Sequence, residues 1–170
     1  SLFNVGLENR HHMFWDGRIH YNPFIQVFST PEEALNGTNP KAKEITIVLK
    51  SALAAQALFP MVNSAEMMGL PGENEVADAE NNLEAWDRII ERLKRENSDQ
   101  EKSKNYVKLF LQAYPDTTIE KINIGHVAEA IAVFQREEFQ SIDSPFQRYL
   151  RGDNKAMTVA QKRGFAVFLG

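Results

Sequence analysis

Apolar side chains follow a helical period over much of the chain after residue 41. They recur at intervals of three and four residues at Ile45, Val48, Leu49, Ala52 and Leu53. This spacing predicts an amphipathic helix from about Ala42 to Leu58, because residues three and four apart lie on one face of a helix. Pro60 would end that helix, since proline has no backbone N–H to donate.

Further helices are predicted downstream. Apolar stripes of helical period consist of Trp86, Ile89, Ile90 and Leu93, then of Val107, Phe110, Leu111 and Tyr114, and then of Ile124, Val127, Ala128, Ile131 and Phe134. Ser98 and Glu101 have the spacing of a capping box, which predicts that the helix with the middle stripe begins at Ser98.

Two shorter helices are predicted near the C-terminal end. Ser144 followed by Pro145 is typical of a helix N-terminus, and Gly152 would end that helix. Thr158 and Gln161 form another capping-box pattern, which opens a last helix.

The remaining segments show no helical period. Residues 1 to 41 are rich in Asn, Gly and Pro and predict loops, and residues 60 to 78 form a long connection with two prolines and two glycines. No alternation of apolar and polar residues lasts beyond four residues, and no internal repeat occurs. The sequence therefore predicts an all-α protein with long loops.

Composition narrows the class of protein. With 170 residues, of which 43% are hydrophobic and 25% charged, the chain has the size of one globular domain, or of one domain and part of another. Its net charge of −4 argues against a nucleic-acid surface, which needs clustered Lys and Arg. The sequence contains no apolar run long enough to predict a membrane span. The lack of cysteine excludes disulfide and thiolate chemistry within these residues, and the start at Ser1 indicates a trimmed or incomplete chain.

The histidines do not form a metal-binding pattern. His11 and His12 are adjacent, so their side chains point apart on any regular element, His20 follows eight residues later, and His126 lies in a predicted helix. None has the spacing of a ligand pair on one helix face, so no metal ligand is predicted. Glycine-rich phosphate loops and serine-hydrolase motifs are also absent from the sequence.

Two stretches carry residues suited to chemistry. The first is "FWDGR", residues 14 to 18, which places an aromatic pair in a loop. Its simplest interpretation is structural, with Trp15 as a packing anchor, Asp16 and Gly17 as a turn, and Arg18 as an exposed or paired base.

The second stretch is "QALFPMVNSAEM", residues 56 to 67. Gln56 falls on the apolar side of its predicted helix, so its amide must find a partner or face a cavity. Glu66 has Met61, Met67 and Met68 as neighbours in sequence, and a carboxyl group in apolar surroundings is suited to proton transfer near neutral pH. Taken singly, each of these features is more readily explained as structural.

In combination, the stretches resemble one protein family. The order "SLFNVG", "FWDGR", "QAL-P--N--EM-G", "AIAVFQ", "SPFQRYLRGD" and "T--QKRG-A-F" is similar to the bacterial di-haem cytochrome c peroxidase family, which includes the MauG-type enzymes. The resemblance runs in register from Ser1 to Phe168. Its most specific feature is the joint presence of "FWDGR" and "SPFQRYLRGD", and it implies cytochrome c-like helical domains.

The resemblance implies two c-type haems in the full-length protein, each attached through Cys-x-x-Cys-His. One motif would precede Ser1 and the other would follow Gly170, so this chain is expected to be the section between them and to be inactive alone. Residues 1–140 would be the remainder of the first, peroxidatic haem domain, and residues 141–170 the start of the second, electron-transfer domain. Attached haem also implies a periplasmic location.

The resemblance assigns roles to five residues. Trp15 corresponds to the tryptophan between the two haems, on the electron path, and Phe14 would pack beside it. Gln56, Pro60 and Glu66 match residues on the distal side of the peroxide-binding haem. There Glu66 would move a proton between the peroxide oxygens, and Gln56 would orient the peroxide by a hydrogen bond.

The chain departs from the family pattern around this site. Phe59 stands where a glycine usually precedes the proline, and "NPVEM" becomes "NSAEM" with Ser64 and Ala65. "SPFDRYL" appears as "SPFQRYL", and the stretch between residues 18 and 56 is longer than in the commonest members. The loop around Glu66 is therefore expected to have a different shape.

The sequence leaves three functions open. The first is reduction of hydrogen peroxide to water with electrons from a cytochrome c or a cupredoxin, and the second is MauG-like oxidation of a partner protein. The third is a haem-less helical binding or scaffold domain. The resemblance also implies homodimers and calcium for the full-length protein, with the calcium ligands outside this chain, and neither nucleic acid nor membrane is expected as a partner.

Overall fold

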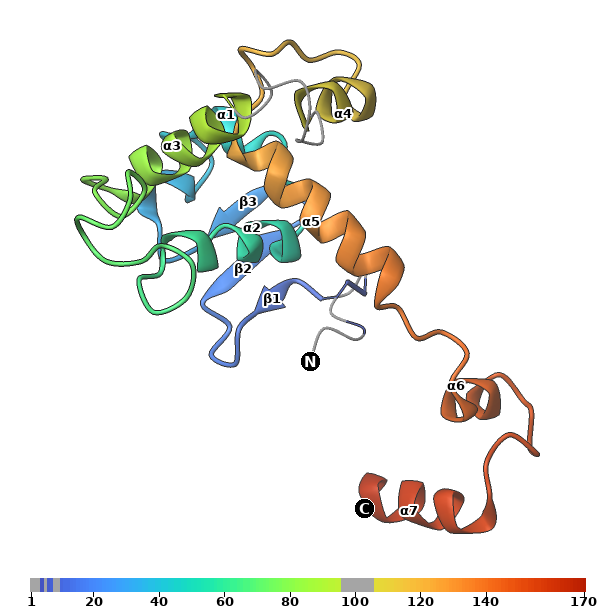
Figure 1. Cartoon of the computed structure of the whole chain (residues 1–170). Coiled ribbons are helices and arrows are strands. Elements are labelled where there is room, and N and C mark those ends of the chain that lie inside the picture. The colour runs from blue at the N-terminus through green and yellow to red at the C-terminus, as the bar shows by residue number, and fades with distance from the viewer. Residues whose placement is uncertain (1–3, 5, 8–9, 96–105) are drawn as a thin grey trace.

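The computed structural model describes residues 4, 6–7, 10–95 and 106–170. The helices are α1 (Lys43–Thr46), α2 (Ala52–Ala57), α3 (Asn82–Arg95), α4 (Tyr106–Ala113), α5 (Ile124–Glu138), α6 (Pro145–Leu150) and α7 (Val159–Leu169), and the strands are β1 (His12–Met13), β2 (Ile19–Asn22) and β3 (Val27–Ser29). Short 3₁₀ helices cover Glu33–Leu35 and Pro60–Val62. The predicted helical fold is confirmed, with a small sheet in addition (Figure 1).

The prediction of loops throughout residues 1 to 41 is wrong, because β1, β2 and β3 form an antiparallel sheet there. Its inner face buries Met13, Ile19, Tyr21 and Phe28, and the rings of Tyr21 and Phe28 stack at 4.5 Å. Strands of two to four residues are too short to produce a visible alternation, so only pairing with a neighbour stabilises them.

The outer face of the sheet carries two histidines. The rings of His12 and His20 stack with centroids 4.3 Å apart. Desolvation lowers the pKa of His20, and the nearby charges of His12 and His11 lower it further.

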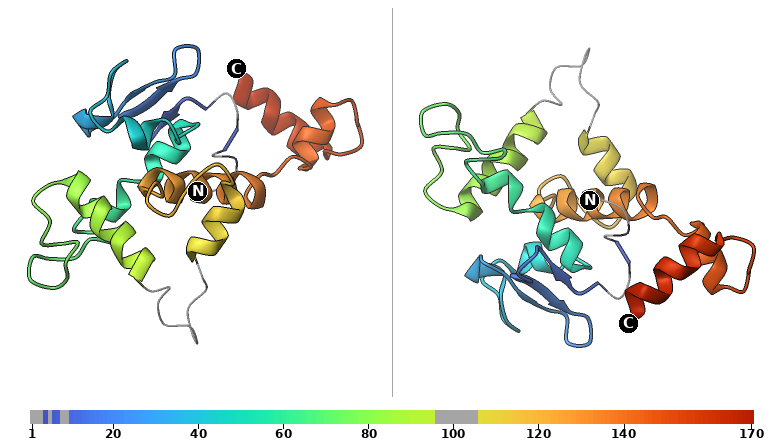
Figure 2. Two further views of the ribbon diagram at one scale, coloured as in Figure 1. Left: turned by 90° about the horizontal axis from the view of Figure 1, so that it is seen from above. Right: turned by 90° about the horizontal axis from the view of Figure 1, so that it is seen from below.

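The core lies where α2 packs against α5 and the sheet, and where α3 packs against α5 and the 3₁₀ helix at Pro60–Val62. Figure 2 shows α5 running through the middle of the body, with the sheet on one side and α3 and α4 on the other. Small side chains permit the close approach of the helices: Ala54 and Ala55 on α2 and Ala128 on α5 are fully buried. On α3, Trp86 is also fully buried, and its indole N–H donates to the Leu58 carbonyl at 3.1 Å. This hydrogen bond satisfies the one polar atom of the largest core side chain.

The prediction of one continuous helix from Ala42 to Leu58 is wrong, because the chain leaves the helical conformation between α1 and α2. The backbone N–H of Lys50 donates to the buried carboxylate of Glu129 on α5 at 2.9 Å. Ser51 is extended, and its hydroxyl accepts from the Ala54 N–H to cap α2. A tertiary acceptor and a new N-cap thus replace the hydrogen bonds of a continuous helix.

The start of α5 lies very close to α1. A Cβ atom at Gly125 would come within 2.7 Å of the Ile45 carbonyl oxygen, so only glycine fits. Asn123 and His126 form a capping box at this end of α5, with the imidazole Nδ1 accepting from the Asn123 N–H at 3.2 Å. The histidine predicted to lie in a helix therefore stabilises the start of that helix.

The two C-terminal capping patterns are confirmed. The Ser144 hydroxyl accepts from the Gln147 N–H at the start of α6, and Thr158 and Gln161 form the same reciprocal pair at the start of α7. The capping box predicted at Ser98 and Glu101 lies outside the described residues.

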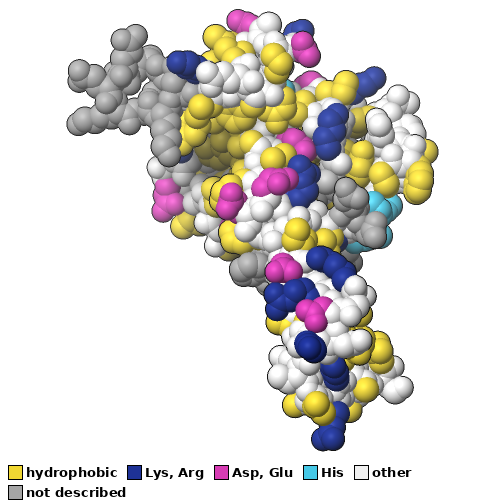
Figure 3. All heavy atoms as spheres, turned by 90° about the vertical axis from the view of Figure 1, so that its right-hand side faces the viewer, with side chains coloured by type: hydrophobic (Ala, Val, Ile, Leu, Met, Phe, Trp, Pro, Cys, Tyr) yellow, Lys and Arg dark blue, Asp and Glu magenta, His cyan; other side chains and the backbone are white. Residues whose placement is uncertain are grey.

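Helices α6 and α7 form a protrusion from the body (Figures 1 and 3). Neither helix has a buried residue, and the rings of Phe146 and Phe165 pack edge to face at 4.9 Å. Val167 and Phe168 are more than four-fifths exposed. Within the described part of the chain, no helix is long and apolar enough to cross a bilayer.

Replacing Glu129 with Ala should destabilise the fold. The Lys50 N–H would lose its acceptor in a buried place, which costs about 1–3 kcal/mol in the free energy of unfolding. Glu129→Gln keeps an oxygen acceptor and should lose less. Chemical denaturation measures both values, and Glu138→Ala, exposed on the same helix, serves as the control. Equal stability of the Glu129→Ala and Glu138→Ala variants would contradict the role given to Glu129.

Candidate functional site

The "FWDGR" stretch forms the connection between β1 and β2. Phe14 and Gly17 both adopt positive φ angles, of 65° and 68°, and the Gly17 N–H donates to the Phe14 carbonyl at 3.3 Å. The Asp16 carboxylate accepts from the backbone N–H of Arg18 at 3.2 Å and from its Nε at 3.1 Å. A non-glycine residue at positive φ is strained, and the surrounding hydrogen bonds hold it in place.

These contacts fix the side chains of the turn. The Arg18 guanidinium lies over the Phe14 ring, 4.5 Å from its centroid. Partial desolvation raises the pKa of Asp16, but the hydrogen bonds from Arg18 outweigh it, so that the pKa lies below its ordinary value. Trp15 is 92% exposed. The expectation of Trp15 as an anchor packed on the helices is therefore wrong within the described residues.

The loop after α2 is organised by Asn63. Its side-chain amide donates to Glu66 Oε1 at 3.2 Å, and its Oδ1 accepts from the Ala65 N–H at 3.0 Å. Its carbonyl accepts from the N–H groups of Glu66 and Met68, at 3.0 and 3.1 Å. One residue thus sets both the backbone path and the direction of the Glu66 side chain.

The turn and this loop meet at a cavity of about 400 Å³. Its lining residues include Phe14, Arg18, Phe59, Pro60, Val62, Asn63 and Glu66. The structure therefore brings together Phe14, Pro60 and Glu66 from two segments almost 50 residues apart in the sequence. Trp15 and Gln56 do not line this cavity.

Two expectations about burial are corrected. Glu66 is exposed rather than enclosed by methionines, since Met67 is itself 70% exposed and only Met61 is buried. Gln56 is half-buried on α2, whose buried positions are its first four residues. The predicted place of Gln56 on the apolar side required one continuous helix from Ala42 to Leu58, and the break between α1 and α2 removes that condition.

Arg18, Phe59 and Asn63 belong to the cavity but were not predicted as site residues. A signal for Asn63 exists in the sequence, because Asn followed three residues later by Glu is a spacing typical of local side-chain to backbone hydrogen bonds. No local signal marks Arg18 or Phe59, since only the meeting of two distant segments places them together.

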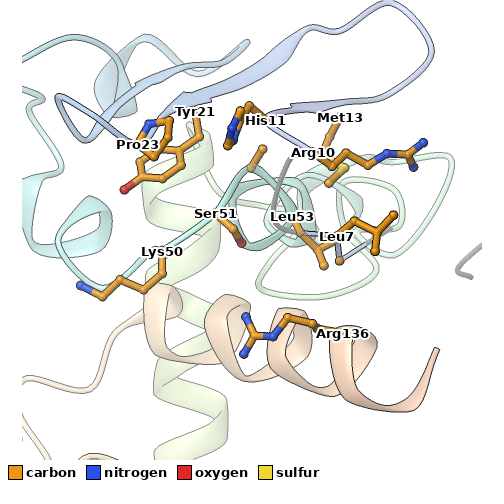
Figure 4. Close-up of a pocket in the computed structure, with 12 residues that line it drawn as sticks. Leu7, Arg10, His11, Met13, Tyr21, Pro23, Lys50, Ser51, Leu53 and Arg136 are labelled. Carbon is orange, nitrogen blue, oxygen red and sulfur yellow. The ribbon is translucent and has the colours of Figure 1, made fainter. Parts of the chain in front are cut away.

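Other hollows occur in the described part of the chain. A cavity of about 890 Å³ between α4 and α5 is lined by Leu109, Phe110 and Phe134, and Figure 3 shows a hydrophobic hollow on that face. A smaller cavity of about 230 Å³ has Arg10, His11, Tyr21, Lys50 and Arg136 in its lining (Figure 4). Neither contains any of the predicted site residues.

The cavity at Glu66 combines apolar side chains with polar ones, among them an acid–base group. Phe14, Phe59 and Pro60 provide rigid apolar surface, while Glu66 is an acid–base group held by Asn63. No group of three or more His, Asp or Glu side chains suited to a metal ion occurs among the residues that the structure describes.

Comparison with protein families identifies one match. Residues 1–155 match the family model described as di-haem cytochrome c peroxidase. This stretch contains the turn, the Asn63 loop and α6.

Three curated proteins share parts of the sequence. Cytochrome c peroxidase Ccp of Escherichia coli is 34% identical over 84 residues, 49% of this chain and 16% of that protein. Methylamine utilization protein MauG of Methylophilus methylotrophus is 41% identical over 63 residues, 37% of this chain and 18% of that protein. MauG of Methylorubrum extorquens is 38% identical over 86 residues, 51% of this chain and 22% of that protein. The matches thus span less than a quarter of each relative, and no solved structure matches the chain.

Replacing Asn63 with Ala should loosen the loop that carries Glu66. Loss of the Oδ1 acceptor removes a hydrogen bond worth about 1 kcal/mol from the Ala65 N–H. Amide hydrogen exchange at Ala65 should become about fivefold faster. Ser64→Ala, at the exposed neighbouring position, is the control, and unchanged exchange in the Asn63→Ala variant would show that Asn63 does not organise the loop.

Proposed function

We propose, from the premise that this chain belongs to the di-haem cytochrome c peroxidase family, that the full-length protein reduces hydrogen peroxide to water. Electrons would come from a small redox protein, a cytochrome c or a cupredoxin. The single observation that carries the proposal is the cavity that unites Phe14, Pro60 and Glu66. The family implies c-type haem as the redox cofactor.

The apolar residues of the cavity would form part of the wall of a haem site. Two phenylalanine rings and a proline offer apolar surface of the kind that a macrocycle covers, and the exposed indole of Trp15 stands at the adjoining hairpin tip. The chain has no cysteine, so it supplies no thioether attachment. When bound, the haem iron supplies the redox chemistry, while the protein controls access and proton delivery.

Glu66 is the proposed acid–base residue. Its carboxylate would take the proton from one peroxide oxygen and give it to the other, so that water is the leaving group. The hydrogen bond from Asn63 would hold the carboxylate in position for this transfer. Gln56 is half-buried and lies outside the cavity lining, so its proposed role of orienting the peroxide by a hydrogen bond rests on the family likeness alone.

Trp15 is proposed as the relay for electrons between two haems. An indole is among the few side chains that can be oxidised by one electron, and this one is 92% exposed at the hairpin tip. Phe14, held under Arg18, would support it from the protein side. We assign residues 1–140 to the peroxidatic domain and residues 141–170 to the start of the electron-transfer domain, because α6 and α7 protrude from the body.

The proposal includes the setting of the full-length protein. Two c-type haems imply a periplasmic location, and a homodimer is proposed by family likeness. Calcium would need ligands beyond the described residues, which contain no cluster of acids and histidines suited to a cation.

A MauG-like function is the second candidate. Two of the curated relatives are named as methylamine utilization proteins, and they are 41% and 38% identical to this chain over the matched stretches. Under this alternative the full-length protein would oxidise side chains of a partner protein, with Trp15 again as the relay.

In the haem-loaded full-length protein, Glu66→Gln should lower kcat for peroxide by roughly 10²- to 10⁴-fold, because the amide cannot carry the proton. Haem content, measured from the absorption spectrum, should not change. Glu73→Gln makes the same chemical change in the same long connection, outside the cavity, and should retain full turnover. Near-normal turnover of the Glu66→Gln variant would refute the role of Glu66.

The electron source separates the two candidate functions. We expect the full-length protein to oxidise a reduced cytochrome c or cupredoxin at two electrons per peroxide consumed, as the balance of peroxide reduction to two waters requires. Stopped-flow absorption of the donor measures this ratio. Peroxide consumption that depends on a protein substrate, with no oxidation of either donor, would favour the MauG-like function instead.

A further inference from the structure

The hairpin that carries Trp15 also holds a pair of histidines that the proposed peroxidase function does not use. His12 on β1 and His20 on β2 are direct partners across the antiparallel pair. Their neighbours His11 and Tyr21 are joined by a hydrogen bond from the Tyr21 N–H to the His11 carbonyl at 2.9 Å. Because hydrogen-bonded and non-hydrogen-bonded pairs alternate along an antiparallel ladder, His12 and His20 form a non-hydrogen-bonded pair, in which side chains lie closest.

The two imidazoles are in contact and accessible. Their ring centroids are 4.3 Å apart with an interplanar angle of 24°. His12 is exposed and His20 is partly exposed, on the face of the sheet opposite the core. The residue opposite His20 on β3 is Ser29, a small exposed side chain that leaves the space beside the pair open. Figure 3 shows histidine side chains at the surface of the body.

His11 directly precedes β1. It lines the small basic cavity together with Tyr21 (Figure 4). The chain therefore provides a third histidine that is adjacent in sequence and lines a cavity to which neither His12 nor His20 belongs. This residue is a matched control for any ligand role of the pair.

We propose that His12 and His20 together bind a first-row transition-metal cation, such as Zn²⁺, on the outer face of this sheet. Imidazole nitrogens bind such ions at about 2.0–2.1 Å. Cβ atoms of directly opposed residues lie about 4.5–5.5 Å apart, which allows both rings to turn from stacking to a shared ion. Solvent completes the coordination, since no third acid or histidine joins a metal cluster among the described residues.

The ion would clamp the hairpin. His12 and His20 stand on either side of the turn at residues 14 to 18, so a bridge between them closes the loop that presents Trp15. Binding to the folded pairing alone stabilises that pairing, because the two ligands are not held together in the unfolded chain. The site uses residues of the hairpin only and is independent of whether the cavity at Glu66 reduces peroxide.

Calorimetric titration of the full-length, tag-free protein with Zn²⁺ tests the site. The wild-type protein should show a Zn²⁺ site that both His12→Ala and His20→Ala weaken by at least about tenfold, a loss expected when half of the protein ligands are removed. His11→Ala should bind as the wild type does. A haem-dependent signal is not needed, because Zn²⁺ is redox-inactive and binding is measured as heat.

Thermal unfolding provides the second readout. Saturating Zn²⁺ should raise the Tm of the wild type and of the His11→Ala variant, and should not raise it in the His12→Ala variant. His12→Gln, a change at the more exposed position of the pair, guards against a loss of folding and should behave as His12→Ala does. Equal Zn²⁺ affinity in the wild type and in the His12 and His20 variants would overturn the proposal, whatever the peroxide turnover.

Discussion

The hydrogen bond between the buried carboxylate of Glu129 and the backbone N–H of Lys50 joins α5 to the junction between α1 and α2. It fixes the point where α1 ends and α2 begins, and so the direction in which α2 leaves. Helix α2 leads directly into Pro60 and the loop of Asn63 and Glu66. The position of the candidate site therefore depends on a contact between residues 79 apart in the sequence.

The candidate site combines rigid and open parts. The hairpin turn is held by Asp16 and Arg18, and the second loop by Asn63, so both walls of the cavity are braced by local hydrogen bonds. Glu66 and Trp15, in contrast, are exposed. The walls of the cavity are therefore ordered locally, while the side chains of Glu66 and Trp15 remain accessible.

The fold was predicted well where the signal is local. The capping pairs at Ser144 and Thr158 and the apolar stripes of α3 and α5 involve residues within a few positions of each other, so the sequence alone predicts them. The sheet was missed because each of its strands is too short to show a period before it is paired.

The order of the motifs in the sequence predicted the site residues, but it did not predict how these residues lie relative to one another. The sequence by itself determined the helical class, the capped helix ends, the family likeness, and the candidates Phe14, Trp15, Gln56, Pro60 and Glu66. Only the tertiary structure decided that Phe14, Pro60 and Glu66 share a cavity with Arg18, that Gln56 and Trp15 lie outside its lining, and that Glu66 is exposed. It also decided the pairing of His12 with His20. The physical reason is that these relations depend on strand register and on a helix break set by a distant carboxylate, and neither leaves a pattern in neighbouring residues.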